Sequence, residues 1–344
     1  MQSVPSIRTT VVGSYPVPDW LRVYPTRQAL IDAMMVVIKT QELAGIDVVA
    51  DGELGRFDVN HPETNGMIDY FVGRMSGIDT AVTREELRHF REQESAGYRA
   101  RPAGIVRGPI GEGTLHLADD FALARPLTNR SLKFTLTGPH MLAKVLMDAH
   151  FRSRAELALN LADVLARQVT ELAADVVQID EANISGHPED APWAAPAINR
   201  VLESLPRGIE KGVHVCFGNY GGQTVQKGLW RALVPFFNQL NADHLVLEFA
   251  RRGYGELEVL RDVKPTVRLG IGVIDIKDNV VESSDLVASR IDQAVRVLGS
   301  QRVAFAHPDC GFWMLPRNVA DGKMRALVAG RDKFLGTREE KVVG

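Results

Sequence analysis

The chain has 344 residues, of which 45% are apolar, and a net charge of −3. This length suits one large domain or two average ones. Its 40 Lys and Arg residues nearly balance its 43 Asp and Glu residues, which gives no electrostatic basis for nucleic-acid binding. No apolar run approaches the ~20 residues that a membrane span needs, and the first residues lack the features of an export signal. We therefore expect a cytoplasmic protein that acts on small molecules; the sequence does not indicate its oligomeric state.

Short apolar segments alternate with segments of helical spacing along the chain. In chain order, the predicted strands are 9–13, 46–51, 133–137, 176–180, 212–217, 244–249, 266–270 and 302–307. The strand segments are continuously apolar, as in parallel strands covered on both faces. Between them, segments such as 154–174 and 284–298 repeat apolar residues at helical spacing. Eight such units predict an α/β fold of the (β/α)8, or TIM, barrel type. A doubly wound sheet is the alternative, but it rarely needs eight units.

The segment 55–130 interrupts this alternation. It is long, charged and rich in Gly, Arg and His. We interpret it as an insertion between strands two and three that folds over the mouth of the barrel. Because no linker, repeat or low-complexity tract divides the chain, we expect residues 1–344 to form a single domain.

Polar residues gather where the predicted strands end. In a TIM barrel the loops after the strands build the functional mouth. The residues at or just beyond these ends are Ser14, Asp51, Glu53, Thr137, Asp180, Glu181, His214, Cys216, Glu248, Asp275 and Cys310. An acid after a strand can simply cap a helix. Capping does not explain why nearly every strand ends in a charged or metal-binding group, so the pattern favours a functional mouth.

Both cysteines of the chain belong to this set. Cys216 follows His214 by two residues, Cys310 lies after the last strand, and Glu248 ends the strand between them. One nitrogen, one oxygen and two sulfur ligands form a set that zinc takes in tetrahedral sites. The alternative is that two buried thiols pack as small hydrophobic groups. Ligands from distant strand ends would place the metal in a pocket.

Seven segments in order carry a resemblance to a known family. They are Val12-Gly13-Ser14-Tyr15-Pro16, Asp51-Gly52-Glu53, Leu136-Thr137-Gly138-Pro139, Gln178-Ile179-Asp180-Glu181, His214-Val215-Cys216, Glu248 and Pro308-Asp309-Cys310-Gly311. With these segments the chain resembles the C-terminal catalytic domain of the cobalamin-independent methionine synthases. It is also similar to epoxyalkane:coenzyme M transferases.

The resemblance implies a zinc site and a binding site for an amino-acid thiol. It implies that His214, Cys216, Glu248 and Cys310 hold Zn²⁺, and that the sulfur of the substrate joins the metal. It further implies that Ser14 binds the carboxylate of homocysteine, and that Glu53 and Asp180 bind its ammonium group.

Departures from the family leave the alkyl donor open. The chain has no counterpart of the N-terminal half of the full-length synthases, and it lacks the tryptophan expected after Thr137-Gly138-Pro139. Lys277 stands where the synthases carry a histidine in an Asp-Ile-His run. Methylfolate and an epoxide are both candidate donors, and Lys277, Asp275 and His140 are the candidate acids that would protonate the leaving group.

The sequence thus predicts a zinc-dependent thiol alkyltransferase, with methyl transfer to homocysteine as the leading hypothesis. One alternative is that a zinc-bound thiolate adds to another electrophile, as in the coenzyme M transferases. Another is a zinc barrel that binds a thiol without turnover. A decarboxylase of the porphyrinogen type offers no use for the four predicted ligands. Thiol-dependent turnover distinguishes the enzyme hypotheses from a binding protein.

Overall fold

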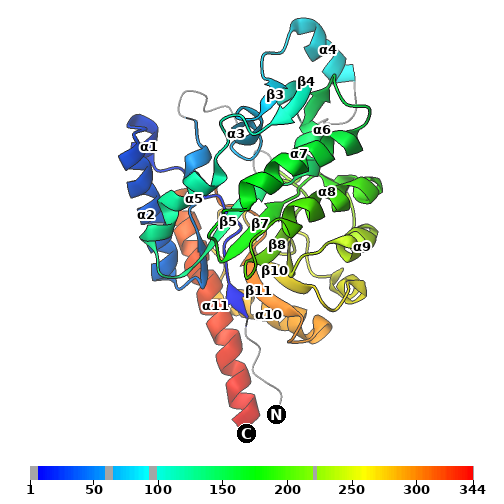
Figure 1. Ribbon diagram of the computed structural model, residues 1–344. Helices are drawn as coiled ribbons and strands as arrows, with labels where there is room; N and C mark the ends of the chain where they lie inside the picture. Colours follow the sequence, from blue (N-terminus) through cyan, green and yellow to red (C-terminus); the bar gives the residue numbers. More distant parts are fainter. Residues whose placement is uncertain (1–6, 59–64, 93–98, 220–222, 344) are drawn as a thin grey trace.

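The computed structural model describes residues 7–58, 65–92, 99–219 and 223–343. Eight parallel strands form one sheet in the order β1-β11-β10-β9-β8-β7-β5-β2, with helices around it (Figure 1). The strands are β1 (Arg8–Thr9), β2 (Val48–Ala50), β5 (Ser131–Thr137), β7 (Val176–Asp180), β8 (Glu210–Val215), β9 (His244–Leu247), β10 (Arg268–Ile274) and β11 (Val303–Pro308).

A contact between the first and last strands of this order closes the sheet into a barrel. Thr10 forms a parallel bridge with Val48, just after β1 and at the start of β2. Side chains reinforce the closure, because Asp47 Oδ2 accepts hydrogen bonds from N (2.7 Å) and Oγ1 (2.9 Å) of Thr9. The predicted TIM barrel is therefore confirmed.

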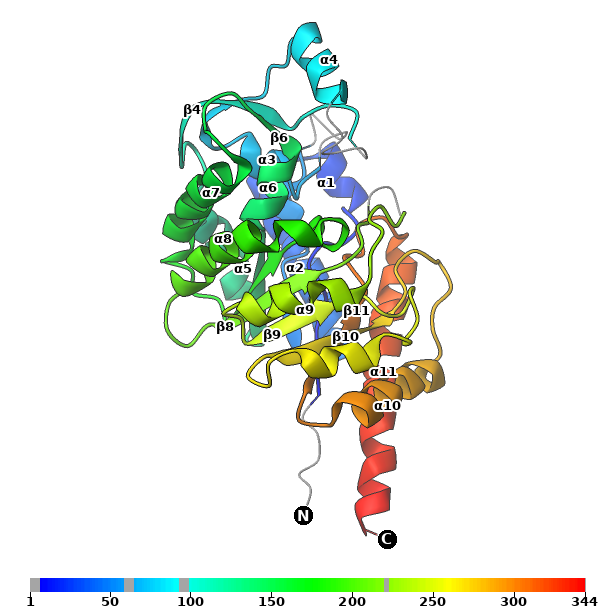
Figure 2. The ribbon, with the colours of Figure 1, turned by 90° about the vertical axis from the view of Figure 1, so that its right-hand side faces the viewer.

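Eleven α-helices occur among the described residues, and most of them cover the outside of the barrel (Figure 2). They are α1 (Asp19–Val23), α2 (Arg27–Ala44), α3 (Asp69–Val72), α4 (Arg84–Glu92), α5 (Leu117–Ala124), α6 (Pro139–Val145), α7 (Arg154–Val169), α8 (Ala191–Glu203), α9 (Trp230–Gln239), α10 (Ser284–Leu298) and α11 (Arg317–Val343). Short 3-10 turns are η1 (Leu54–Arg56), η3 (Arg125–Leu127), η4 (Ile184–Gly186), η5 (Pro188–Asp190) and η6 (Leu257–Asp262). No helix in the described ranges is both long and apolar enough to cross a membrane.

Serine caps begin two of the helices that the spacing predicts. Ser153 accepts a hydrogen bond from Glu156 N before α7, and Ser283 accepts one from Leu286 N before α10. Helix α10 has the predicted bounds, whereas α7 ends at Val169, five residues before the predicted end. Apolar spacing continues beyond α7 because the following residues enter the core as a loop.

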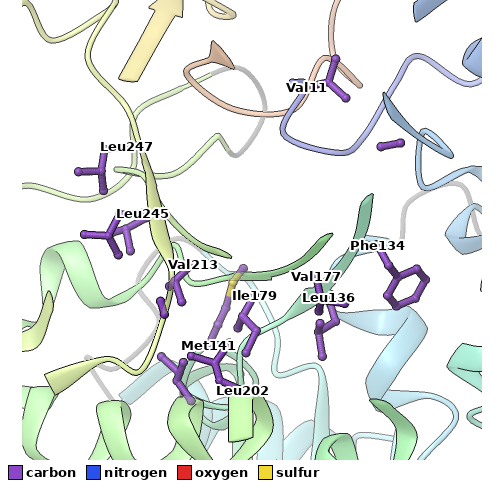
Figure 3. Packing of buried hydrophobic residues seen from close by; sticks show 14 of the residues in the cluster. Val11, Phe134, Leu136, Met141, Val177, Ile179, Leu202, Val213, Leu245 and Leu247 are labelled. Carbon is purple, nitrogen blue, oxygen red and sulfur yellow. The ribbon is translucent and has the colours of Figure 1, made fainter. Parts of the chain in front are cut away.

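One large hydrophobic core lies between the strands and the helices. Outward-facing strand residues such as Val213 and Ile179 pack with Leu202 of α8 in this cluster, part of which Figure 3 shows. Strand β10 runs four residues beyond its predicted end at Gly270. The predicted strand stops early because glycine is rare in strands. In the structure, Gly270 and Gly272 are accommodated because they leave room for the side chains of His307 and Asp309.

The interior of the barrel is partly polar. Lys133 of β5 is buried and donates hydrogen bonds to the Val11 carbonyl and to Gln178 Oε1 (2.8 Å). Gln178 in turn donates to the Val12 carbonyl at 3.0 Å. These side chains satisfy carbonyl groups of the segment after β1, which continues beyond the strand ladder.

The segment between β2 and β5 carries part of a second, smaller sheet. Strands β3 (Ser76–Asp79), β4 (Gly104–Gly111) and β6 (Leu146–Asp148) form it in the order β3-β4-β6. This sheet and α4 lie beyond one end of the barrel in both ribbon views (Figures 1 and 2). Two parts of the predicted insertion, 59–64 and 93–98, lie outside the described residues. The sequence pattern did not predict the small sheet, because β3 is short and partly exposed and β4 contains three glycines and a proline and is buried only in its first residues.

Candidate metal centre and substrate pocket

Three predicted metal ligands meet at the mouth of the barrel. His214 lies in β8 and Cys216 just after it, and the two-residue spacing turns both side chains to the same face. Cys310 comes two residues after the end of β11. One possible ligand atom from each of the three residues lies within 4.8 Å of the others, and the two sulfur atoms are 3.9 Å apart.

The donor atoms of this cluster suit a metal ion. Nδ1 of His214 lies 2.9 Å from the Val246 carbonyl and donates to it, which leaves Nε2 with a free lone pair. This Nε2 is buried and has no hydrogen-bond partner among the described residues. A hydrogen bond from the Cys216 thiol, together with the nearby His214 ring, holds the pKa of Cys310 well below its usual range. One nitrogen and two sulfurs are soft ligands of the kind that zinc accepts.

Glu248 does not join this cluster; it directly follows β9. Its Oε1 lies 2.9 Å from Nζ of Lys277, and its Oε2 accepts a hydrogen bond from Phe217 N at 2.8 Å. The group of possible metal ligands contains His214, Cys216 and Cys310 but not Glu248. The structure therefore brings three of the four predicted ligands together.

The predicted substrate-binding residues share one cavity with the cluster. Ser14, Glu53 and Asp180 line this cavity together with His214, Cys216 and Cys310. Its wall also includes residues of the β2–β5 segment, among them Asn65 and Met67. The cavity thus connects a sulfur-rich corner with an acidic one.

Ser14 lies directly beside the Cys310 loop. Its carbonyl oxygen accepts a hydrogen bond from Phe312 N at 2.8 Å. A Cβ atom at position 311 would collide with Oγ of Ser14, so Gly311 allows this close approach. The hydroxyl of Ser14 is thereby held on the cavity wall next to the metal cluster.

Glu53 occupies an unusual backbone conformation. Its φ is 58°, in the left-handed region that non-glycine residues rarely adopt, and it follows Gly52 with φ 76°. The side chain of Asp51 supports the turn by accepting a hydrogen bond from Glu53 N at 2.8 Å. The turn directs the carboxylate to Thr135, whose Oγ1 donates to Oε1 at 2.7 Å. Backbone strain of this kind is typical of functional sites.

Arg56 is a cavity residue that sequence reasoning missed. Its Nη1 lies 3.6 Å from Oε2 of Glu53, and its guanidinium group lies 5.3 Å from the ring centroid of Phe71. Only 8% of Arg56 is exposed. The spacing of Glu53 and Arg56, three residues apart on one turn, was the available signal.

Asp180 is a buried carboxylate at the end of β7. Gln178, two residues earlier on the same face, donates a hydrogen bond to Oδ1 at 2.7 Å. Burial raises the pKa of Asp180 to about 7, and the nearby Glu53 adds to the increase. Two carboxylates on one wall create a site that favours a cation.

The three candidate acids lie outside the set of cavity-lining residues. His140 is fully buried, with Nδ1 2.8 Å from Glu181 Oε1 and Nε2 3.1 Å from Asp190 Oδ2. Burial alone would lower the pKa of His140, but these carboxylates raise it. Lys277 contacts Glu248, and Asp275 lies 3.3 Å from Nη1 of Arg251.

Comparisons with known proteins identify the family and support the fold. The family described as "Cobalamin-independent synthase, Catalytic domain" matches residues 7–330. The chain is 29% identical to a methionine synthase of Thermococcus kodakarensis, over 95% of this chain and 93% of that protein. It is 27% identical to a methionine synthase of Sulfurisphaera tokodaii, over 96% and 93%. A B12-independent methionine synthase from Shewanella sp. W3-18-1, solved with selenomethionine, has the same fold, with a TM-score of 0.78, 23% identity, and coverage of 98% of this chain and 99% of that one.

Proposed function

Because the chain belongs to the family of cobalamin-independent synthase catalytic domains, we propose that it is a homocysteine S-methyltransferase that forms methionine. The observation that carries this proposal is the shared cavity, which has His214, Cys216 and Cys310 at one side and Glu53 and Asp180 at the other. Its relatives named methionine synthase, which match nearly the full chain, support the same activity.

In this proposal the cluster of His214, Cys216 and Cys310 holds Zn²⁺. The orphaned Nε2 of His214 and the two neighbouring sulfur atoms support this assignment. Zinc, when bound, would deprotonate a coordinated thiol, so that the nucleophilic thiolate is available at neutral pH. The Val246 carbonyl keeps the histidine ring in the orientation and tautomer that a metal ligand needs.

The other side of the cavity would hold the amino-acid end of homocysteine. Glu53 and Asp180 offer negative charge to the ammonium group, and the hydroxyl of Ser14 offers a donor to the carboxylate. Thr135 and Arg56 hold the Glu53 carboxylate in place before the substrate arrives. Binding of both the ammonium and the carboxylate group would orient the sulfur of homocysteine toward the cluster. This orientation would lower the entropic cost of reaching the transition state.

The methyl donor approaches from the open side of the cavity, and methylfolate is the donor that we propose to test first. His140 has both ring nitrogens next to carboxylates, and Asp275 lies beside Arg251. Neither of these side chains lines the cavity. The proposal therefore assigns no protein side chain as the acid that protonates the leaving group.

A product assay tests the proposal. The zinc-loaded protein is incubated with homocysteine and methyltetrahydrofolate, and methionine is measured by mass spectrometry. Methyl donors of other classes and coenzyme M with an epoxide serve as parallel reactions. We expect thiol-dependent methionine formation that is absent in the Cys310→Ser variant. A product formed from coenzyme M and not from homocysteine would contradict the proposal.

A further inference from the structure

The interior of the barrel holds a lysine that the proposed reaction does not use. Lys133 of β5 is 2% exposed and is not among the described residues that line the cavity. Its Nζ donates hydrogen bonds to the Val11 carbonyl and, at 2.8 Å, to Oε1 of Gln178. Burial of a lysine is unfavourable, because it removes the amine from water. An apolar side chain would fill the same space at lower cost, so the role of Lys133 depends on its hydrogen bonds.

These hydrogen bonds do not depend on the charge of the lysine. Burial lowers the pKa of Lys133 to about 7, although the nearby Asp180 and Glu53 oppose the shift. The neutral amine keeps two N–H donors and the ammonium form has three. Both forms therefore have enough donors for the Val11 carbonyl and for Gln178.

Gln178 connects this lysine with the acidic side of the cavity. Because its Oε1 accepts from Lys133, its Nε2 must face the opposite way. There Nε2 donates to the Val12 carbonyl at 3.0 Å and to Oδ1 of Asp180 at 2.7 Å. Without a donor at Oε1, the amide would be free to turn and to present its oxygen to the carboxylate. Lys133 thus determines which end of the amide Asp180 meets.

Asp180 is the member of this chain of contacts that lines the cavity. A carboxylate that an amide already holds in one orientation loses less freedom when a ligand binds. The same strand supports the second acid of the cavity. Thr135, two residues after Lys133 on β5, donates from Oγ1 to Oε1 of Glu53 at 2.7 Å. Alternate residues of β5 therefore serve both acids, Thr135 directly and Lys133 through Gln178.

We propose that Lys133 and Gln178 are a positioning pair: Lys133 orients the amide of Gln178, and the amide orients the Asp180 carboxylate to bind the ammonium group of an amino-acid thiol. This inference rests on the proposed function, which places that ammonium group at Asp180. The pair determines how strongly the enzyme prefers thiols that carry an amino group. Its two members act through Asp180 and do not contact the substrate.

Two thiols that differ only in the amino group test the inference. Homocysteine and 4-mercaptobutanoate, the same thiol without the amine, are titrated into the zinc-loaded protein by calorimetry. The parent should bind homocysteine more tightly. Lys133→Met and Gln178→Met should each raise the Kd of homocysteine about tenfold and change that of 4-mercaptobutanoate less than about twofold. A general structural defect would weaken both thiols alike, so the ratio of the two Kd values distinguishes positioning from stability.

The double variant tests whether the two residues act in series. If Lys133 reaches Asp180 only through the amide, adding Lys133→Met to Gln178→Met should change the homocysteine Kd by less than about a further twofold. Independent contributions would instead multiply to about a hundredfold and would overturn the pair.

A second buried lysine provides a matched control. Nζ of Lys323 lies 2.9 Å from Oε2 of Glu282 and donates to the Val280 carbonyl. Lys323→Met removes the same chemical groups from another part of the barrel. It should lower the free energy of unfolding and leave the ratio of the two Kd values at the parent value.

Each remaining outcome has a defined meaning. A parent-like ratio in folded Lys133→Met or Gln178→Met would overturn the inference and leave the proposed function in place. If Lys133→Met does not fold, Gln178→Met decides, because it keeps the contact of Lys133 with Val11: a lost preference for homocysteine supports the pair, and an unchanged one overturns it. A parent without any preference for homocysteine would overturn the assignment of the ammonium group, and the inference with it.

Discussion

Two carboxylates on neighbouring strands, Asp180 buried at one end of the barrel and Glu210 partly buried at the other, have opposite environments. Asp180 ends β7 at the mouth, receives its hydrogen bond from the neutral Gln178, and has a pKa raised to about 7 by burial. Glu210 begins β8 at the other end, where Arg8 and Arg268 lie 2.6 and 2.8 Å away. Burial opposes ionisation there too, but contacts with His244 and Arg8 lower the pKa of Glu210 to about 2.

The different environments of Asp180 and Glu210 indicate that one carboxylate serves ligand binding and the other serves the stability of the fold. The protein supplies cations to the acid at the closed end, and that acid stabilises the fold. At the mouth Asp180 accepts its hydrogen bond from an amide, and the attraction of His214 and Arg56 does not offset its burial, which costs stability and prepares the cavity for a cationic ligand. The two ends should therefore respond differently to substitution, as is typical of TIM barrels.

Cys310→Ser should have the largest effect at the mouth. The cluster would lose a sulfur ligand, so we expect bound zinc and detectable turnover to disappear. Metal analysis and the methionine assay measure both. With chelator present, the parent and the variant should unfold at the same denaturant concentration. A variant that is active without metal would contradict the role of the cluster.

His140→Gln tests whether a buried residue near the mouth contributes to the stability of the fold, as Glu210 does at the closed end. It would remove the imidazole ring whose nitrogens contact Glu181 and Asp190. We expect the free energy of unfolding to fall by about 3 kcal/mol, with kcat reduced less than tenfold at a temperature where the variant is folded. Chemical denaturation and steady-state kinetics provide the two values. A large loss of kcat with unchanged stability would instead support His140 as a catalytic acid.

Glu53→Gln and Asp180→Asn should weaken substrate binding and spare the metal. Loss of a charged contact to the ammonium group costs about 1.5–3 kcal/mol, so kcat/KM for homocysteine should fall by roughly ten- to a hundredfold. We expect KM to carry most of this change and zinc content to stay at the parent value. Loss of zinc in either variant would show that the two sides of the cavity are not independent.

Glu210→Gln should have the smallest effect on activity and a measurable one on stability. Arg8 and Arg268 would lose their carboxylate, which we expect to lower the free energy of unfolding by about 1–3 kcal/mol at pH 7. The kcat/KM value should remain within about twofold of the parent, as expected for a surface far from the mouth.

The same variant has a characteristic pH dependence. Because the folded pKa of Glu210 is lowered from 4.5 to about 2, its contribution is present above pH 4.5 and lost as the pH falls toward 2. The difference in unfolding free energy between parent and variant should therefore shrink across that range. A difference that is constant from pH 7 to pH 2 would rule out the ionised carboxylate as its source.

The sequence predicted the parts of the molecule that depend on local pattern. Apolar runs located the eight barrel strands, and the two-residue spacing of His214 and Cys216 placed both on one face. The sequence pattern did not predict contacts between residues that are distant along the chain. Nothing in the local pattern connects Lys277 with Glu248, which lies 29 residues earlier and contacts it in the structure. The sequence suggested Lys277 as a candidate acid and Glu248 as a candidate metal ligand, without indicating that they form a pair. Arg56 was missed because an exposed turn and a buried one look alike until the aromatic rings around it are located.

The contact between β1 and β2 closes the barrel with fewer paired residues than the other strand pairs have; we call this contact the seam. Each neighbouring pair from β7 to β11 shares four or more paired residues, whereas β1 meets β2 through one bridge and a few hydrogen bonds of Thr9, Thr10 and Asp47. Amide hydrogen exchange should therefore be fastest along this seam. Local opening there would separate Ser14 from Glu53, while Cys216 and Cys310 follow β8 and β11, which the sheet still joins through β9 and β10. Local opening of the seam would thus weaken binding of an amino-acid product and leave the metal centre intact.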